Sequence, residues 1–231
     1  MLKLAIGNKN YSSWSMRPWV LLRHFNIPFT EVMVRFDSFD AGSSFKTTVE
    51  QLSPVGKVPV LLHGDLAVWD TLAIAEYVAE YAAEHFPEQA LWPRDQAARA
   101  RARSLCAEMH SGFGALRSAC PMNIEAHLPA VGAQMLAERP AVAADLARIV
   151  AMWQGALAAS GGPFLFGGFG IADAYFAPVV ARLRTYALPV PADITAYMQR
   201  VWASPGVAAW VADALAEADF LAFEEPYRQG R

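Results

Sequence analysis

The sequence predicts a chain in two parts, an α/β unit at 1–82 and an all-α unit at 94–231, joined by a linker at 83–93. Strand-like and helix-like patterns alternate in the first part, whereas every pattern in the second part is helical. Between them, the segment HFPEQALWPRD contains two prolines that interrupt the helical periodicity. This order is typical of two domains, or of one mixed domain with a helical annex.

The first half of the α/β unit predicts a strand, a helix and a second strand. Large apolar residues alternate along 2–6, which indicates a short strand. The segment RPWVLLRHF at 17–25 favours a helix, in which Pro18 is acceptable only in the first turn. The segment at 29–36 is rich in β-branched and aromatic residues and predicts a strand. The polar stretch 37–53 is expected to be irregular.

The second half predicts a hairpin and a helix. The segment VPVLLH at 58–63 and the segment LAVW at 66–69 flank the turn signal Gly64-Asp65, so an antiparallel hairpin is expected. From Asp70 onward the apolar residues recur with the period of a helix. In the second part, helices are expected near 95–118, 126–138, 140–159, 171–187, 192–203 and 206–217.

Composition and charge exclude several classes of protein. The 231 residues are 55% hydrophobic and 18% charged, which supplies a core that a disordered chain lacks. The formal net charge of -3 gives no sign of a nucleic-acid partner, which a basic patch would favour. No apolar run of about 18 residues is free of charges or helix breakers, so no membrane span is expected.

The remaining indicators favour a cytoplasmic protein without a metal. Cys106 and Cys120 are too few for a disulfide framework or a four-ligand zinc site, and we expect both to remain thiols in a reducing compartment. The five histidines show no HExxH-type spacing. The amino-terminal MLKLAIGNKN is too short an apolar stretch for a signal peptide.

Residues that can carry chemistry first occur at Tyr11-Ser12-Ser13-Trp14-Ser15, just before the first predicted helix. One serine there would cap the helix, but three are more than a cap requires. The amino end of a helix also presents free N–H groups and the positive end of the dipole. A thiolate placed there would be stabilised, and a serine hydroxyl would add a hydrogen bond.

Two further segments have both a structural and a functional interpretation. The loop Leu52 to Val60 leads into a strand, and Val58-Pro59 is its unusual element, because a proline at a strand start leaves the preceding backbone free to pair elsewhere. Asp70 and Thr71 are favoured helix caps. They could equally hold the ammonium group and the carboxylate of a ligand beside the amino end of a helix.

Four motifs, in order and at family spacing, resemble the glutathione transferase family over nearly the whole chain. SSWSMR at 12–17 is similar to the serine motif of zeta- and tau-like members, and SPVGKVPVL at 53–61 matches the segment around the family's cis-proline. WDTLAIAEYVAE at 69–80 matches the acidic-plus-hydroxyl motif, and FGGFGIADAYFAPVVAR at 166–182 resembles the capping segment and buried helix of the second domain. The resemblance implies a thioredoxin-like domain followed by an all-helical domain.

The resemblance also implies roles for individual residues. The serine that activates the glutathione thiol falls on Ser12, with Ser13 and Ser15, one and three residues further on, as alternatives. The remaining residues of the implied glutathione site are Val58 and Pro59 for the cysteinyl part, Asp70 and Thr71 for the γ-glutamyl end, and Lys57 or, less directly, Lys46 for the glycine carboxylate.

Three positions depart from the family pattern. Trp14 stands where zeta-like members carry a cysteine, which makes a maleylacetoacetate isomerase role doubtful. Asp70 is shorter than the usual Glu. Gly170 replaces the usual Ser or Thr cap, and Asp173 at the third helical position can still accept amide hydrogen bonds.

The second substrate is expected between the serine loop and the first long helices of the second part. The candidates are Trp14, Met109, His110, Phe113 and Arg117. Met109 and Phe113 at helical spacing are more often core residues. His110 and Arg117 are expected near one face of a single helix. Arg117 could hold an anionic group or pair with Glu108 or Glu125.

The resemblance implies a homodimeric detoxification enzyme that uses glutathione as co-substrate against a small hydrophobic electrophile. The alternatives on the same site are a glutathione-dependent isomerase, dehalogenase or peroxidase. From another class, a non-catalytic ligand-binding member of the family is the rival hypothesis.

Overall fold

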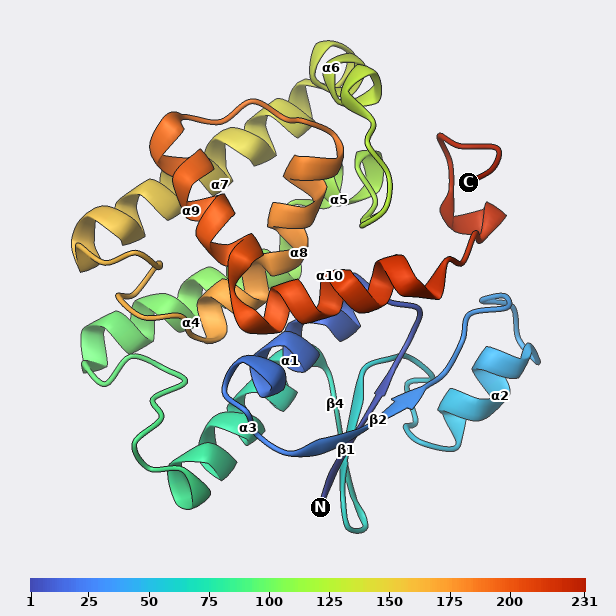
Figure 1. Cartoon of the computed structure of the whole chain (residues 1–231), viewed down its shortest axis with the longest axis vertical. Helices are drawn as coiled ribbons and strands as arrows, with labels where there is room; N and C mark the ends of the chain where they lie inside the picture. The colour runs from blue at the N-terminus through green and yellow to red at the C-terminus, as the bar shows by residue number, and fades with distance from the viewer.

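The computed structural model describes all 231 residues, and its first part is built on a four-stranded mixed sheet (Figure 1). The strands are β1 (Leu2–Ile6), β2 (Phe29–Met33), β3 (Val60–His63) and β4 (Leu66–Trp69), in the order β2-β1-β3-β4. β1 pairs parallel with β2 and antiparallel with β3. β3 pairs antiparallel with β4, which confirms the predicted hairpin.

Helices cover both faces of the sheet. Helices α1 (Ser13–His24) and α3 (Thr71–His85) pack against each other and share the main core with Leu4 of β1. Helix α2 (Ser44–Glu50) packs Phe45 and Val49 in a second, smaller cluster with Ala5. Because neighbouring side chains of a strand point to opposite faces, Leu4 and Ala5 place α2 on the face opposite α1.

The second part is entirely helical and lies against α1 (Figure 1). Its helices are α4 (Gln96–Ser111), α5 (Gly114–Ala119), α6 (Pro129–Glu138), α7 (Pro140–Ser160), α8 (Ile171–Thr185), α9 (Ala192–Ala203), α10 (Pro205–Glu217) and the short 3-10 helix η1 (Ala222–Glu224). Helix α1 contacts both α8 and α10, so the core continues from the sheet into the helices. Residues 86–95 join α3 to α4 and overlap the predicted linker. The division into two domains stays a prediction.

Three local expectations were wrong. The stretch 37–53 contains α2, because Ser43 caps it by accepting from the Lys46 amide at 3.2 Å. The single helix expected at 95–118 is two helices, because Gly112 is extended and Phe113 has a φ of 57°. Pro18 lies in the interior of α1 and not in its first turn, because the helix already begins at Ser13.

The amino end of α8 confirms the expected cap. The Asp173 carboxylate accepts the amides of Gly170 at 3.0 Å and Leu165 at 3.2 Å, and also the Tyr197 hydroxyl at 3.1 Å. Burial raises the pKa of Asp173 to about 6, although each of these hydrogen bonds acts in the opposite direction. The extended Gly170 leaves room for the carbonyl of Leu91, which a Cβ there would approach to 2.9 Å.

Helix α7 is long and apolar enough to cross a membrane by length and composition alone, which the sequence analysis did not anticipate. The core helix of a soluble protein passes the same test. In this structure α7 packs against α5, α6 and α9. Its Asp145 accepts the Leu116 amide of α5 at 2.9 Å, which ties the helix into the protein core.

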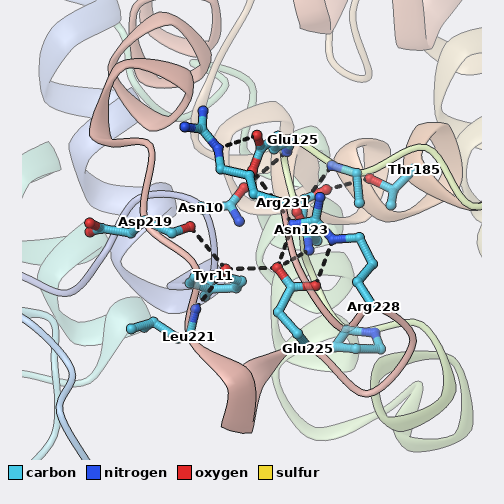
Figure 2. A network of polar contacts seen from close by, with 12 residues as sticks. Asn10, Tyr11, Asn123, Glu125, Thr185, Asp219, Leu221, Glu225, Arg228 and Arg231 are labelled. Atoms are coloured by element: carbon cyan, nitrogen blue, oxygen red, sulfur yellow. Dashed lines mark hydrogen bonds and ion pairs between the residues drawn. The ribbon is translucent and has the colours of Figure 1, made fainter.

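The carboxyl-terminal segment is fastened to the loop before α1 (Figure 2). Glu225 is buried and accepts the Tyr11 hydroxyl at 2.7 Å, the Asn123 amide nitrogen at 2.9 Å and the Arg228 guanidinium at 2.5 Å. Burial opposes ionisation of Glu225, but these donors outweigh it and hold its pKa below the ordinary value. The network therefore favours a charged carboxylate that joins three distant parts of the chain.

Two helical glycines should respond oppositely to alanine. At Gly132 a Cβ would overlap the carbonyl oxygen of Tyr186, so Gly132→Ala should lower the free energy of unfolding by about 1–3 kcal/mol. At Gly155 a Cβ meets nothing within 4 Å, so the matched Gly155→Ala should raise it by up to about 1 kcal/mol. Denaturant unfolding measures both, and equal effects would contradict this packing.

The Glu225 network should make stability depend on pH. Glu225→Gln keeps the side chain's size and removes its charge, so we expect a loss of about 1–3 kcal/mol in unfolding free energy at pH 7. Folding lowers the pKa of Glu225, so the difference in unfolding free energy between wild type and Glu225→Gln should be complete above the pKa of an unfolded glutamate, about 4.3. It should shrink as the pH falls through the folded pKa. Denaturant unfolding from pH 7 to pH 3 tests this, and a constant difference would contradict it.

Candidate functional site

The three sequence segments with candidate chemistry meet at one cleft. Its volume is about 530 Å³, and a neighbouring cavity of about 390 Å³ shares Trp14, Lys57 and Val58 with it. The cleft is lined by Trp14, Val55, Lys57, Val58, Pro59, Trp69, Asp70, Thr71, His110 and Arg117. The neighbouring cavity is lined by Tyr11, Ser12, Ser13, Trp14, Phe36, Phe39, Phe45, Lys46, Lys57, Val58 and Glu224. The shared residues place the two spaces side by side.

The serines of the first segment take different positions. Ser12 is the cap residue of α1, and its hydroxyl lies 2.7 Å from that of Ser15. Ser15 is fully buried, lines neither space and accepts the Gly7 amide at 3.2 Å. Ser13 Oγ accepts from the Arg182 guanidinium at 3.3 Å. Ser12 and Ser13 therefore line the cavity, while the buried Ser15 contacts Ser12 through the hydrogen bond between their hydroxyls.

The amino end of α1 offers unpaired donors. The backbone amides of Trp14 and Ser15 donate no hydrogen bond within the chain. The Tyr11 hydroxyl donates to Glu225 and so belongs to the Glu225 network (Figure 2). Burial and the Glu225 hydrogen bond raise the pKa of Tyr11 to about 12, so this phenol stays protonated near neutral pH. The positive end of the helix and the Ser12 hydroxyl are thus the groups that favour an anion here.

Val58 presents free backbone at the middle of the cleft. The Val58-Pro59 peptide bond is cis, as the resemblance implied. Neither the amide nor the carbonyl of Val58 forms a hydrogen bond within the chain, and β3 begins only at Val60. A peptide group of a ligand can therefore pair with Val58.

Asp70 links the cleft to the second part of the chain. It has a φ of 73° and caps α3 by accepting the amides of Leu72 at 2.8 Å and Ala73 at 3.3 Å through one oxygen. The other oxygen lies 3.2 Å from His110 Nε2. Thr71 follows at the first position of α3 and is buried.

His110 has defined partners that the sequence could not supply. Its Nδ1 lies 2.7 Å from the Tyr175 hydroxyl of α8, and its ring centroid lies 5.1 Å from that of Trp14. Burial raises the pKa of Tyr175 well above its ordinary value, so its hydroxyl stays protonated near neutral pH. Tyr175 lies 65 positions away and no local pattern marks it as part of the site.

Arginines surround Trp14. The Arg17 guanidinium lies 4.2 Å from the Trp14 ring centroid and the Arg117 guanidinium 5.0 Å from it. Arg17 is buried, and it donates to the carbonyls of Tyr175 at 2.9 Å and Ser13 at 2.8 Å. Burial lowers the pKa of Arg17 to about 9 and that of Arg182 to about 10. Sequence reasoning missed Arg17 and Arg182 as site residues, although Arg17 lies one turn after Ser13.

The other predicted residues divide between the site and the core. Lys57 borders both spaces. Lys46 borders only the neighbouring cavity, and its ammonium group donates to the Gly56 carbonyl at 2.9 Å. Met109 and Phe113 are buried in the main core and do not line the cleft.

The expected arrangement of His110 and Arg117 was wrong in detail. His110 is on α4 and Arg117 on α5, because the chain turns at Gly112 and Phe113, yet both line the cleft. Arg117 does not pair with Glu108 or Glu125, because these two carboxylates are taken by other arginines.

Comparison with known proteins identifies the family. Residues 11–80 match the model described as glutathione S-transferase, N-terminal domain, and residues 96–213 match that of the C-terminal domain. Glutathione S-transferase 1 of Dianthus caryophyllus is 48% identical over 50 residues, which cover 22% of this chain and 21% of that protein.

Solved structures share the fold over nearly the whole chain. A glutathione transferase homologue from Sulfitobacter with bound glutathione is 28% identical with a TM-score of 0.67, covering 92% of this chain and 97% of its own. A homologue from Burkholderia, also with bound glutathione, is 24% identical with a TM-score of 0.65, covering 93% and 98%. The Tau class enzyme of Mangifera indica is 21% identical with a TM-score of 0.68, covering 94% and 96%.

These matches confirm the expected fold class, a thioredoxin-like part followed by an all-helical part. The two matched family models span most of the sequence and meet at the cleft described above. The protein therefore belongs to the glutathione S-transferase family.

Proposed function

We propose that the protein binds reduced glutathione in the cleft and activates its thiol for attack on a hydrophobic electrophile. One observation carries the proposal: the amino end of α1 with Ser12, the free backbone of Val58, and the Asp70-Thr71 pair line two adjoining spaces that share Val58. Glutathione bound to the Sulfitobacter and Burkholderia homologues supports the choice of ligand.

The chemistry of glutathione fits these groups along its length. The free amide and carbonyl of Val58 would pair with the cysteinyl part, as a neighbouring strand would. The Asp70 carboxylate would receive the γ-amino group, and the amino end of α3 at Thr71 would hold the adjacent carboxylate. Lys57, or Lys46 beside it, would hold the glycine carboxylate at the other end.

The thiol would ionise at the amino end of α1. The hydroxyls of Ser12 and Ser15 lie 2.7 Å apart, and either one can donate to the other. If Ser15 donates to Ser12, the Ser12 proton is free for a thiolate, while the Gly7 amide holds Ser15 in place. The helix dipole and the unpaired amides would also lower the thiol pKa, as the hydrogen bond from Ser12 would.

The reaction would then be a displacement or an addition. The thiolate sulfur forms a bond to the electrophilic carbon, and a leaving group, where present, departs with its electron pair. The aromatic side chains of the cleft, Trp14 and Trp69, give the electrophile an apolar surface. Binding both reactants together contributes through proximity, and Ser12 contributes through the thiolate.

The proposal extends to assembly and location. The family resemblance implies a homodimer, and we expect the buried Cys106 and Cys120 to remain thiols in a reducing cytoplasm. A mass in solution near 25.2 kDa, the mass of one chain, would contradict the dimer.

Calorimetric titration of reduced glutathione into the full chain, alongside an assay with 1-chloro-2,4-dinitrobenzene, is the primary test. We expect binding and turnover, because the cleft supplies a partner for each part of glutathione. Binding without turnover would favour an isomerase, a peroxidase or a ligand carrier. Absence of binding would overturn the proposal.

Ser12→Ala should lower kcat by about 100-fold while the glutathione Kd stays nearly unchanged, because a donor to the thiolate is lost and the remaining contacts persist. Ser104→Ala on the exposed face of α4 is the matched control and should leave both constants unchanged. If Ser12→Ala retains full turnover, Ser12 has no such role, and Ser13→Ala and Ser15→Ala then decide between the two alternatives.

A further inference from the structure

Arg117 is a cation in the cleft without a carboxylate partner. Its guanidinium is half-buried, donates to the Gly112 carbonyl at 3.2 Å and lies 5.0 Å from the Trp14 ring centroid. It belongs to no ion pair, whereas Arg103 and Arg148, which lie on the outer surface, each bind a glutamate through two nitrogens.

Two buried arginines behind Arg117 add to this positive charge. Arg182 donates to the Arg117 carbonyl at 3.1 Å, to the Cys120 carbonyl at 2.5 Å and to Ser13 Oγ at 3.3 Å. Arg17 donates only to the carbonyls of Tyr175 and Ser13. Neither forms an ion pair, and Glu224, which lines the neighbouring cavity, is the smallest influence on the pKa of Arg182. A charge buried with only neutral partners is costly to stability.

The positive potential therefore concentrates on the serine side of the cleft. The three guanidiniums are close enough to repel one another, and this repulsion adds to burial in lowering the pKa of Arg17 and of Arg182. An anion placed between Ser13, Trp14 and Arg117 would relieve the repulsion. It would also gain a charge-assisted hydrogen bond from the one guanidinium that lines the cleft.

The charges of glutathione leave Arg117 unused. Glutathione carries one ammonium group, which Asp70 matches, and two carboxylates, which Lys57 and the amino end of α3 match. Arg117 is on α5, in the helical part of the chain, and its guanidinium lies against the Trp14 ring. Its position is that of a group for the second substrate.

We propose that the second substrate is an aromatic electrophile that carries a carboxylate, which Arg117 binds while the ring packs on Trp14. This inference rests on the proposed function and specifies the substrate class of that site. With an aryl halide the step is balanced as written: the glutathione sulfur bonds to the ring carbon, the carbon–halogen bond breaks, halide leaves with the electron pair, and the thiol proton passes to solvent.

The test compares two electrophiles of similar shape, the anionic 4-chloro-3-nitrobenzoate and the neutral 4-chloro-3-nitrobenzamide, and reads the effect of each variant relative to wild type on the same substrate. Arg117→Gln should lower kcat/KM for the benzoate by at least about 10-fold and change it for the benzamide by less than about 2-fold. Arg117→Lys should restore part of the loss, because it returns the charge without the forked geometry. The glutathione Kd should not change in either variant.

The control is Arg101→Gln, an exposed arginine on α4 outside the cleft, which removes the same charge and should affect neither substrate. A binding measurement makes the test independent of turnover: wild-type protein should bind S-(4-carboxybenzyl)glutathione at least about 10-fold more tightly than S-(4-carbamoylbenzyl)glutathione, and Arg117→Gln should abolish that preference.

Two failures are distinguishable. If glutathione binds but Arg117→Gln affects the charged and neutral partners equally, or the wild-type protein prefers the neutral conjugate, this inference is overturned and the proposed function stands. If glutathione itself does not bind, the proposed function falls, and this inference falls with it.

Discussion

The packing of α1 between the sheet and the helical part is the constraint on which the rest of the structure depends. This helix contacts α3 on one side and α8 and α10 on the other, and its apolar residues belong to a core that runs through both parts. Its amino end, with Ser12, Ser13 and Trp14, also lines the site. Because Arg17 bonds to Ser13 within α1 and to Tyr175 in α8, the serine loop cannot move independently of the second part.

The buried arginines around α1 lower the stability of the fold but supply positive charge to the site. Arg17 and Arg182 are buried with carbonyl and hydroxyl partners only, an arrangement that gains little stability compared with an ion pair or an apolar side chain. In return, they place positive charge next to a helix end that already favours an anion. The same field would stabilise a thiolate and attract a charged second substrate, so one feature explains both proposals.

The loop before α1 owes its shape to residues far away in the sequence. Asn8 binds Asp219 at 2.7 Å, and the Lys9 amide donates to Glu217 at 2.8 Å. Tyr11 binds Glu225, as Figure 2 shows. The carboxyl-terminal segment therefore acts as a brace for the residues that lead into Ser12. Its Glu224 borders the neighbouring cavity, so it also shapes that space.

The sequence by itself determined most of the order of elements, apart from α2 and the break between α4 and α5, and it nominated the residues with candidate chemistry. The period of apolar residues was enough to locate the hairpin at Gly64-Asp65 and most of the helices, and short motifs were enough to nominate Ser12, Val58 and Asp70, because each depends on neighbours within a few positions. It failed where a turn depends on one backbone angle, as at Phe113, which divides an otherwise continuous helical pattern. Only the tertiary structure decided that His110 contacts Asp70 and Tyr175, that Ser15 is buried beneath Ser12, and that Arg17, Arg117 and Arg182 surround one tryptophan and one serine. Those contacts join residues up to 169 positions apart, and such pairings arise from the packing of whole helices, which no local pattern contains.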